Sequence, residues 1–297
     1  MTMPNFFVIG AGRSGTTSLH NYLSQHPDIF MTEMKEPSYF AFEDERDLGR
    51  GARSRWLRDN TVLDEPGYLG LFAHAGAEKF RGESSPRYLE TKTSPGRILK
   101  AVPEARMVVM LRHPVDRCFA QYNGEIRDGW GDGKSFADSL VAARGSEGVD
   151  GPYSRRVEIG FYHRHLRHWL EHFPRDRFCI QLFDDFASDP LAVARNVFGF
   201  LGVDVDFQPD VSRQFNQSGM IRNPVIRFLW TRSNGIRWAL RPYLPKTMRD
   251  RVYHAAVRNV EKQTLPGEAR TRLLQIYRED TLELQDLLDR DLSKWLK

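Results

Sequence analysis

A glycine-rich segment near the start of the chain, from Gly10 to Thr17, has the residue types of an anion-binding loop. Its glycines have the GxxxxG spacing of a P-loop, but Thr16 occupies the position of the phosphate-binding lysine. Backbone N–H groups of such a loop, together with the N-terminus of a following helix, can bind one phosphate or phosphosulfate group. A plain strand-to-helix turn, capped by Ser and Thr, is the alternative at this point.

A second feature separates this loop from the loops of triphosphate hydrolases. The apolar run from Met107 to Leu111 is followed by Arg112, where such an enzyme usually has a magnesium-binding acid. Because both the loop lysine and this acid are missing, hydrolysis of a nucleoside triphosphate is disfavoured. The loop retains the ability to bind an anionic group.

The glycine-rich loop and Arg112 must be held in place by the strands and helices around them. The sequence predicts these elements from short apolar runs that alternate with helical patterns. The runs predict four buried strands, at 6–9, 107–111, 178–182 and, shorter, 79–83. Helical periodicity follows the loop from Leu19 and recurs at 166–173 and at 190–201, where Asp189-Pro190 favours the start of a helix and Gly202 its end. This alternation predicts an α/β fold of three layers, with a central parallel sheet flanked by helices. The polar stretches 43–67 and 129–153 are expected to run over the surface.

Composition excludes several classes of protein. The 297 residues are 40% apolar and 28% charged, which excludes a disordered or collagen-like chain, and the net charge of +4 is far below that of a dedicated nucleic-acid binder. Cys118 and Cys179 lack metal-ligand spacing and are expected to be buried free thiols. The first ten residues lack the charge and apolar length of a signal peptide or membrane span, so the expected location is the cytoplasm.

Further motifs follow one another along nearly the whole chain. They are Arg13-Ser14-Gly15-Thr16-Thr17-Ser18-Leu19, Lys35-Glu36-Pro37-Ser38-Tyr39-Phe40, Gly82-Glu83-Ser84-Ser85-Pro86-Arg87-Tyr88, Leu111-Arg112-His113-Pro114-Val115-Asp116-Arg117 and Asp291-Leu292-Ser293-Lys294-Trp295. With these motifs the chain resembles the sulfotransferases that use 3′-phosphoadenosine 5′-phosphosulfate (PAPS) as donor, and among them the bacterial-type enzymes and the heparan sulfate sulfotransferase domains. The resemblance implies a P-loop-like fold, a single domain over residues 1–297, and sulfuryl transfer that requires no metal.

The resemblance also assigns the donor site. The 5′-phosphosulfate group would be bound by the loop residues Arg13, Ser14, Gly15, Thr16, Thr17 and Ser18, with Arg13 stabilising the charge that develops on the leaving phosphate. Arg112 resembles the arginine that binds the 3′-phosphate. The serine that normally follows eight residues later is Ala120 in this chain, and Arg222 is a second candidate for a phosphate contact.

Two carboxylates are candidates for the base that removes a proton from the acceptor. Glu36 aligns with the carboxylate that resembles the base of heparan-type enzymes, and Glu83 is the second candidate, which could instead brace Arg13 or Lys35. Heparan-type enzymes tend to have Lys where this chain has Ser84, and Arg87 or Lys35 could replace that charge. His165 lies near a histidine position of related N-sulfotransferase domains, but the cluster of His163, His165, His168 and His172 favours a solvated helix face.

The segment 222–258 carries a local charge of +8 and several aromatic residues. A helical cap over the donor pocket is the favoured interpretation, and peripheral contact with an anionic membrane is the alternative. For the whole chain, the sequence predicts sulfuryl transfer from PAPS to an acceptor hydroxyl, or less readily an amine, of a carbohydrate, lipid-linked glycan or small metabolite. A P-loop-type nucleotide-binding or kinase-like protein, and a sulfonucleotide binder without activity, remain as alternatives.

Overall fold

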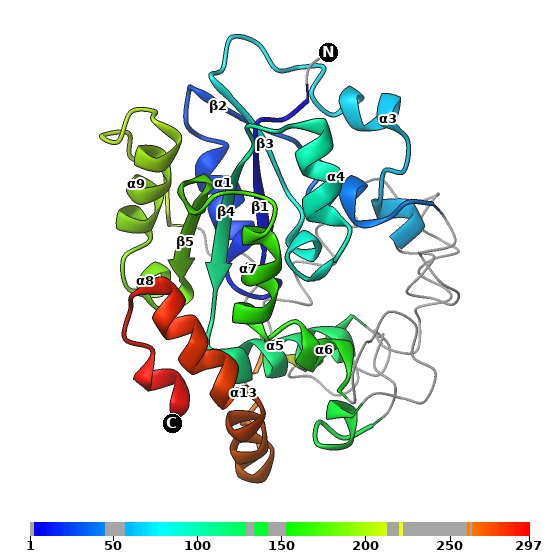
Figure 1. Ribbon diagram of the computed structural model, residues 1–297, viewed down its shortest axis with the longest axis vertical. Helices are drawn as coiled ribbons and strands as arrows, with labels where there is room; N and C mark the ends of the chain where they lie inside the picture. Colours follow the sequence, from blue (N-terminus) through cyan, green and yellow to red (C-terminus); the bar gives the residue numbers. More distant parts are fainter. Residues whose placement is uncertain are drawn as a thin grey trace.

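A five-stranded parallel sheet lies at the centre of the computed structural model, which describes residues 3–44, 57–128, 134–141, 153–212, 220–221, 260–261 and 263–297 (Figure 1). The sheet has the order β2-β3-β1-β4-β5, from β1 (Phe6–Gly10), β2 (Ile29–Met31), β3 (Phe80–Ser84), β4 (Arg106–Leu111) and β5 (Phe178–Leu182). Four of these strands are the ones predicted from apolar runs. The prediction missed β2, because a strand of three residues is too short to show periodicity.

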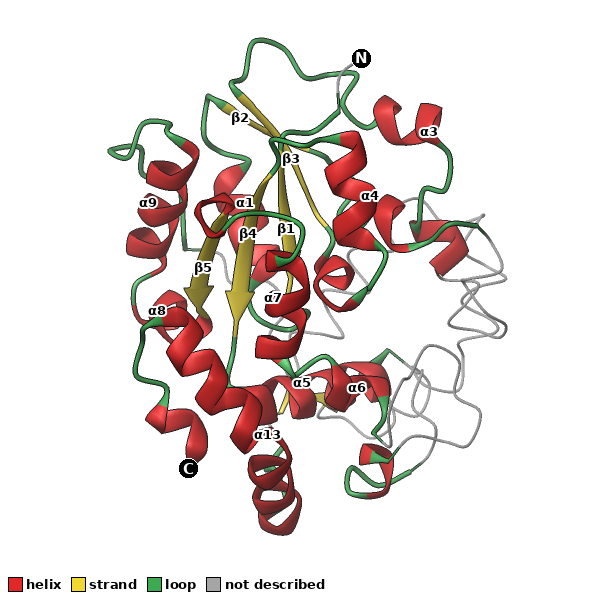
Figure 2. Cartoon of the chain, in the orientation of Figure 1, coloured by secondary structure: helices red, strands yellow, loops and turns green. Residues whose placement is uncertain are grey.

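Helices cover both faces of the sheet, which confirms the three-layer α/β prediction (Figure 2). Phe7 and Ile9 of β1 pack with α4 (Ser94–Ala101) and α7 (Tyr162–Leu170) on one face. The alternate residues Phe6 and Val8 pack on the other face, together with α1 (Thr16–Leu23) and α9 (Pro190–Leu201). As predicted, Asp189 caps α9 by accepting from Ala192 N, and Gly202 ends it in the left-handed conformation.

A third apolar cluster lies beyond the carboxyl edge of the sheet, between α5 (Pro114–Arg127), α6 (Arg155–Glu158) and α13 (Gly267–Leu288) (Figure 1). The remaining elements are short, namely α3 (Glu65–Gly70), α8 (Phe183–Ser188) and the antiparallel pair β6 (Met220–Ile221) and β7 (Val260–Glu261). Cys118 and Cys179 are buried and free, as predicted. Among the described residues, no helix has the length and apolar character needed to cross a membrane.

The topology has a switch point at the carboxyl end of β1. The helix that follows β1 packs on one face of the sheet, and α4, which follows β3, packs on the other. Open parallel sheets bind their ligands at such a switch point. The segments that leave β1, β3 and β4 at this edge begin at Ala11, Ser85 and Arg112, and these segments carry most of the predicted site.

Candidate functional site

The glycine-rich loop connects β1 to α1 at the carboxyl edge of the sheet. Ala11 N donates to Met110 O at 2.6 Å, which holds the start of the loop against β4. Gly15 has a φ of +87°, and a Cβ there would press on the rings of Phe183 and Phe186, so the position requires glycine. The first turn of α1 contains no acidic residue, so the positive end of the helix attracts an anion without competition from its own side chains.

Ser14 provides a direct test of whether this loop fits a phosphosulfate group. Its side chain is fully buried, and among the described residues only the Tyr162 hydroxyl lies near enough to interact with its Oγ, without the geometry of a full hydrogen bond. Buried hydroxyls are normally hydrogen-bonded, so this one is suited to donate to an anion oxygen in the loop. Thr16 and Ser18 are also buried at the start of α1, and Thr17 is half-buried, so the loop predicted to bind the donor is rich in hydroxyl groups.

Two arginines meet at the loop. Arg112 leaves β4 and donates from Nη1 to Arg13 O at 3.3 Å, while its guanidinium lies over the Phe183 ring, 4.7 Å from the ring centroid. The Arg13 side chain is 27% exposed, and its Nη2 lies 3.8 Å from Asp128 Oδ2. The structure therefore places both arginines predicted from the sequence at the anion-binding loop.

Helix α5 presents small residues on the side that faces Arg13. Gly124 is so close to the Arg13 guanidinium that a Cβ at this position would collide with it. Ala120 lies one turn earlier on the same side of the helix and is buried. The hydrogen-bonded residues Arg117, Gln121 and Glu125 occupy a different side of α5. Sequence reasoning missed Gly124, although a glycine inside a helical pattern was the available signal.

Glu36 lies beside β3 and close to the loop. Its backbone N donates to Ser84 O at 2.9 Å, and its Oε1 is 2.6 Å from Lys35 Nζ. Burial raises the pKa of Glu36, but the charge and hydrogen bond of Lys35, with the charges of Arg13 and Arg87, outweigh burial, and the pKa is lowered. The side chain is 45% exposed, so solvent and substrates can reach an ionised carboxylate.

The backbone around this carboxylate is strained. Arg13, Glu36 and Ser38 are three of the four non-glycine residues with positive φ in the described part of the chain. Each such residue costs about 1–2 kcal/mol and persists only where surrounding contacts hold it. Strain of this kind is concentrated at binding and active sites, so its location agrees with the site predicted from sequence.

Glu83 is fully buried, unlike Glu36. Its carboxylate accepts from Tyr88 at 2.6 Å, from Tyr68 at 3.3 Å and from Ser85 at 2.7 Å. Burial raises the pKa of Glu83 to about 7, although these hydroxyls and Lys35 oppose the rise. Ser85 Oγ in turn accepts from Ser38 N at 2.9 Å. Glu83 therefore holds the segment that carries Glu36, and the structure gives it no exposed oxygen.

Ser84, where the resemblance leads us to expect a lysine, is buried against His20. The two side chains are 2.9 Å apart, between Nδ1 and Oγ. Burial, followed by the charge of Lys35, lowers the pKa of His20 to about 4, so this wall of the site is neutral. Lys35 and Arg87 supply positive charge near Glu36 instead, in line with the prediction from sequence.

The prediction of a solvated histidine face on α7 is wrong for His165. This side chain is half-buried, its Nε2 is 3.0 Å from Glu158 O, and burial lowers its pKa to about 4. The reason is helical geometry, because His165 is adjacent on α7 to the buried residues Tyr162 and Leu166. Arg222 and the rest of the segment 222–258 lie outside the described residues.

The geometry thus consists of an anion-binding loop, two arginines and an exposed carboxylate at one sheet edge. The model of the Sulfotransferase family matches residues 4–207, which include all of these groups. The chain belongs to the sulfotransferase family. A solved sulfotransferase from Alicyclobacillus acidocaldarius is similar to it over 100% of both chains, with 29% identity and a TM-score of 0.75.

Curated relatives of this sulfotransferase include heparan sulfate enzymes. The heparan sulfate glucosamine 3-O-sulfotransferase 3B1 of Mus musculus is 28% identical over 201 residues, 68% of this chain and 46% of the relative. The bifunctional heparan sulfate N-deacetylase/N-sulfotransferase 2 of Homo sapiens is 24% identical over 207 residues, 68% of this chain and 22% of the relative. The chain thus spans about half the length, or less, of these relatives.

Proposed function

We propose that this sulfotransferase moves a sulfuryl group from PAPS to an acceptor hydroxyl. The observation that carries the proposal is the approach of a fixed cation and an ionised carboxylate at the anion-binding loop. Arg13 belongs to the loop, and its charge helps to lower the pKa of Glu36 on the neighbouring segment. A base and a stabilising cation on opposite sides of one reacting group are what in-line transfer of a charged group requires.

In the proposed reaction, the acceptor oxygen forms a bond to sulfur as the bond from sulfur to the bridging phosphate oxygen breaks. Glu36 takes the proton of the acceptor hydroxyl, and Arg13 stabilises the negative charge that develops on the leaving phosphate. An arginine suits this position because it stays charged at any relevant pH and offers several donors. Glu83 holds the Glu36 segment through Ser85 and takes no proton from the acceptor.

The donor would be held by the loop and by Arg112. The buried Ser14 hydroxyl and the N-terminus of α1 fit the phosphosulfate group, and Arg112 fits the 3′-phosphate. Ala120 lies where the relatives have a serine, so this chain lacks that hydroxyl at the 3′-phosphate. Arg222 is proposed as a further phosphate contact.

A carbohydrate hydroxyl is the proposed acceptor. The 3-O-sulfotransferase relatives, by their names, modify a sugar hydroxyl, whereas the N-sulfotransferase relative supports an amine as the second choice. His20 and Ser84 form a neutral wall of the site, and the positive charge near Glu36 comes from Lys35, Arg13 and Arg87.

Titration calorimetry and a transfer assay test the proposal. Adenosine 3′,5′-bisphosphate is expected to bind in the micromolar range, and ATP with Mg²⁺ more weakly; the reverse order would support the kinase-like alternative. Radiolabelled PAPS is then incubated with a panel of neutral and anionic glycans, lipid-linked glycans and small alcohols. Label on at least one hydroxyl compound is expected. Tight nucleotide binding with no labelled product in any class would support an inactive sulfonucleotide binder.

A further inference from the structure

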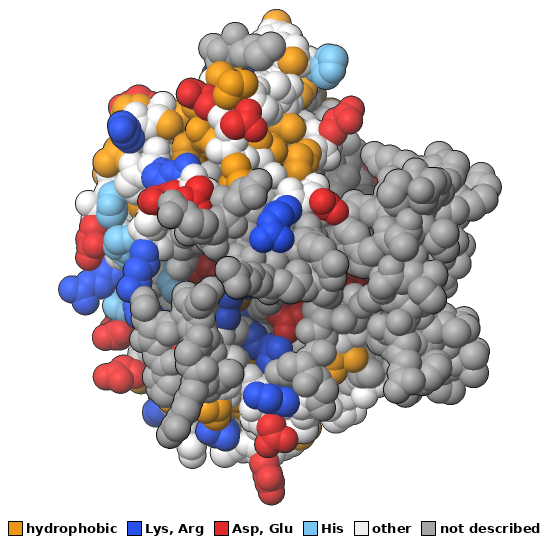
Figure 3. All heavy atoms as spheres, turned by 90° about the vertical axis from the view of Figure 1, so that its right-hand side faces the viewer, with side chains coloured by type: hydrophobic (Ala, Val, Ile, Leu, Met, Phe, Trp, Pro, Cys, Tyr) orange, Lys and Arg blue, Asp and Glu red, His pale blue; other side chains and the backbone are white. Residues whose placement is uncertain are grey.

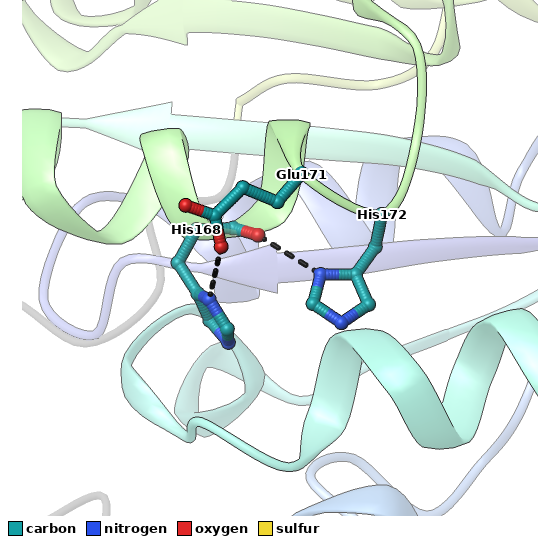
Figure 4. A group of neighbouring side chains, drawn as sticks. All are labelled: His168, Glu171 and His172. Atoms are coloured by element: carbon teal, nitrogen blue, oxygen red, sulfur yellow. Dashed lines mark hydrogen bonds and ion pairs between the residues drawn. The ribbon is translucent and has the colours of Figure 1, made fainter.

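A separate cluster of metal-ligand side chains lies at the C-terminal end of α7. His168, Glu171 and His172 each offer one ligand atom, and these three atoms lie within 4.8 Å of one another (Figure 4). The other end of α7 carries Tyr162, whose hydroxyl donates to Arg112 O. The cluster is therefore at the end of the helix opposite to the sulfotransferase site, and the proposed reaction makes no use of it.

The local backbone keeps these three side chains together. His168 lies in the last turn of α7 and His172 in the tight turn just beyond Leu170, where His172 N donates to Trp169 O. The two rings are neighbours, with centroids 5.0 Å apart. Their four-residue spacing is also that of the two histidines that bind one zinc ion from a helix in known zinc sites.

Hydrogen bonding shows that the cluster needs a positive centre. His168 Nε2 lies 2.9 Å from Lys92 O, so this nitrogen carries a proton and donates to the carbonyl. In the neutral ring, Nδ1 then has only a lone pair, yet it faces Glu171 Oε2 at 3.1 Å. A lone pair and a carboxylate repel each other. The contact is favourable only if a second proton or a metal ion lies between them.

The surroundings favour a bound cation. The last carbonyl groups of α7 carry the partial negative charge of the helix end, which attracts positive charge. The set of two imidazoles and one carboxylate is a common ligand set for Zn²⁺, with bonds of about 2.0–2.2 Å. In a tetrahedron such ligands are about 3.4 Å apart, so the present ligand atoms need to move by no more than about 1.5 Å.

We propose that His168, Glu171 and His172 form a site for a divalent transition-metal ion such as Zn²⁺. The metal takes one imidazole nitrogen from each histidine and a carboxylate oxygen of Glu171, and solvent fills the remaining position. Because His168 also contacts Lys92 O, the ion fixes the end of α7 to the segment that precedes α4. The site stabilises the fold and takes no part in sulfuryl transfer.

Calorimetric titration of ZnCl₂ into untagged, chelator-treated full-length protein tests the proposal. One Zn²⁺ per chain is expected, with a melting temperature that rises with Zn²⁺ concentration, as for any ligand of the folded state. His168→Ala and His172→Ala should each weaken binding at least about tenfold, as expected when one of three ligands is lost. His163→Ala is the matched control, because His163 lies on the same helix but pairs with Glu283.

Two results would overturn the metal site. The first is Zn²⁺ binding that His163→Ala weakens as much as His168→Ala does. The second is the absence of Zn²⁺ binding to the wild type in calorimetry, with no rise of its melting temperature as Zn²⁺ is added.

Discussion

Two carboxylates within one site show how strongly the surroundings of a residue decide its chemistry. Glu36 is partly exposed and surrounded by cations, so its pKa is lowered and it is ionised at neutral pH. Glu83 is fully buried among three hydroxyls, and its pKa is raised to about 7. A base must be ionised and accessible to the acceptor, and of these two carboxylates only Glu36 is both.

Replacement of Glu36 tests this assignment at the residue scale. Glu36→Gln should lower turnover about a hundredfold or more, with affinity for adenosine 3′,5′-bisphosphate nearly unchanged, because the base acts on the acceptor. Since the pKa of Glu36 is lowered, the acid limb of the wild-type kcat/KM profile should lie below the range of an ordinary Glu. Glu33→Gln, at an exposed glutamate three residues away, should keep normal turnover. Equal losses in both variants would contradict the role of Glu36.

Replacement of Arg13 is a second test at the scale of single residues. Arg13→Ala should lower turnover by about 10²–10³-fold, the range for the loss of one oriented donor to a developing charge. The melting temperature should change little, because this partly exposed loop side chain pairs weakly with Asp128, at 3.8 Å, within the described part of the chain. Steady-state kinetics with PAPS and thermal denaturation are the measurements. Near-normal turnover would remove Arg13 from the mechanism.

At the scale of elements, the absence of a side chain at Gly124 of α5 leaves space for the guanidinium of Arg13, the proposed catalytic arginine. Gly124→Ala should leave the fold intact, because only the end of the Arg13 side chain must move and alanine favours a helix over glycine by about 1 kcal/mol. Because the Cβ would displace Arg13 from the reacting group, turnover of the variant should fall by up to about a hundredfold. The matched control is Gly199→Ala in α9, where an added Cβ meets only Val205 at 3.7 Å. A normal rate in Gly124→Ala would show that Arg13 works from another position.

Ala120, on the same side of α5 as Gly124, allows a test of the proposed donor site. Ala120→Ser should add one donor to the 3′-phosphate and tighten binding of adenosine 3′,5′-bisphosphate by about threefold to a hundredfold, the range for a hydrogen bond to a charged group. Adenosine 5′-phosphosulfate lacks this phosphate, so its affinity should not change. Calorimetry with both nucleotides is the measurement. Equal effects on both would place Ala120 away from the 3′-phosphate.

For the whole molecule, the raised pKa of Glu83 links folding to pH. An unfolded glutamate has a pKa of about 4.3, so between that value and about 7 the folded state keeps a proton that the unfolded state has lost. Stability should therefore fall as pH rises across this window, by up to about 1.4 kcal/mol per pH unit. Asp280, with a pKa raised by burial to about 6, acts in the same direction. Urea unfolding across this range should give a flatter profile for Glu83→Gln, and parallel profiles would contradict the raised pKa.

The net charge of the molecule does not locate the site, because charges of both signs lie next to one another on its surface. On the face drawn in Figure 3, basic and acidic side chains lie side by side near the middle of the view. Opposite charges that lie close together shift the pKa of each other, as Lys35, Arg13 and Arg87 do for Glu36. Composition alone reports only a net charge of +4, because it sums over the whole surface.

The sequence by itself determined the four longer strands and the family, and it predicted that the glycine-rich loop, Arg13 and Arg112 lie together at one sheet edge. These features depend on residues that are close in the chain, since a buried strand needs only a run of apolar side chains and a loop only its glycines.

Tertiary structure alone decided which carboxylate is accessible, because Tyr68 and Tyr88 reach Glu83 from separate elements. It also decided that Gly124 leaves room for Arg13 and that His165 lies inward on α7. Burial depends on which segments pack together, and no local pattern carries that information.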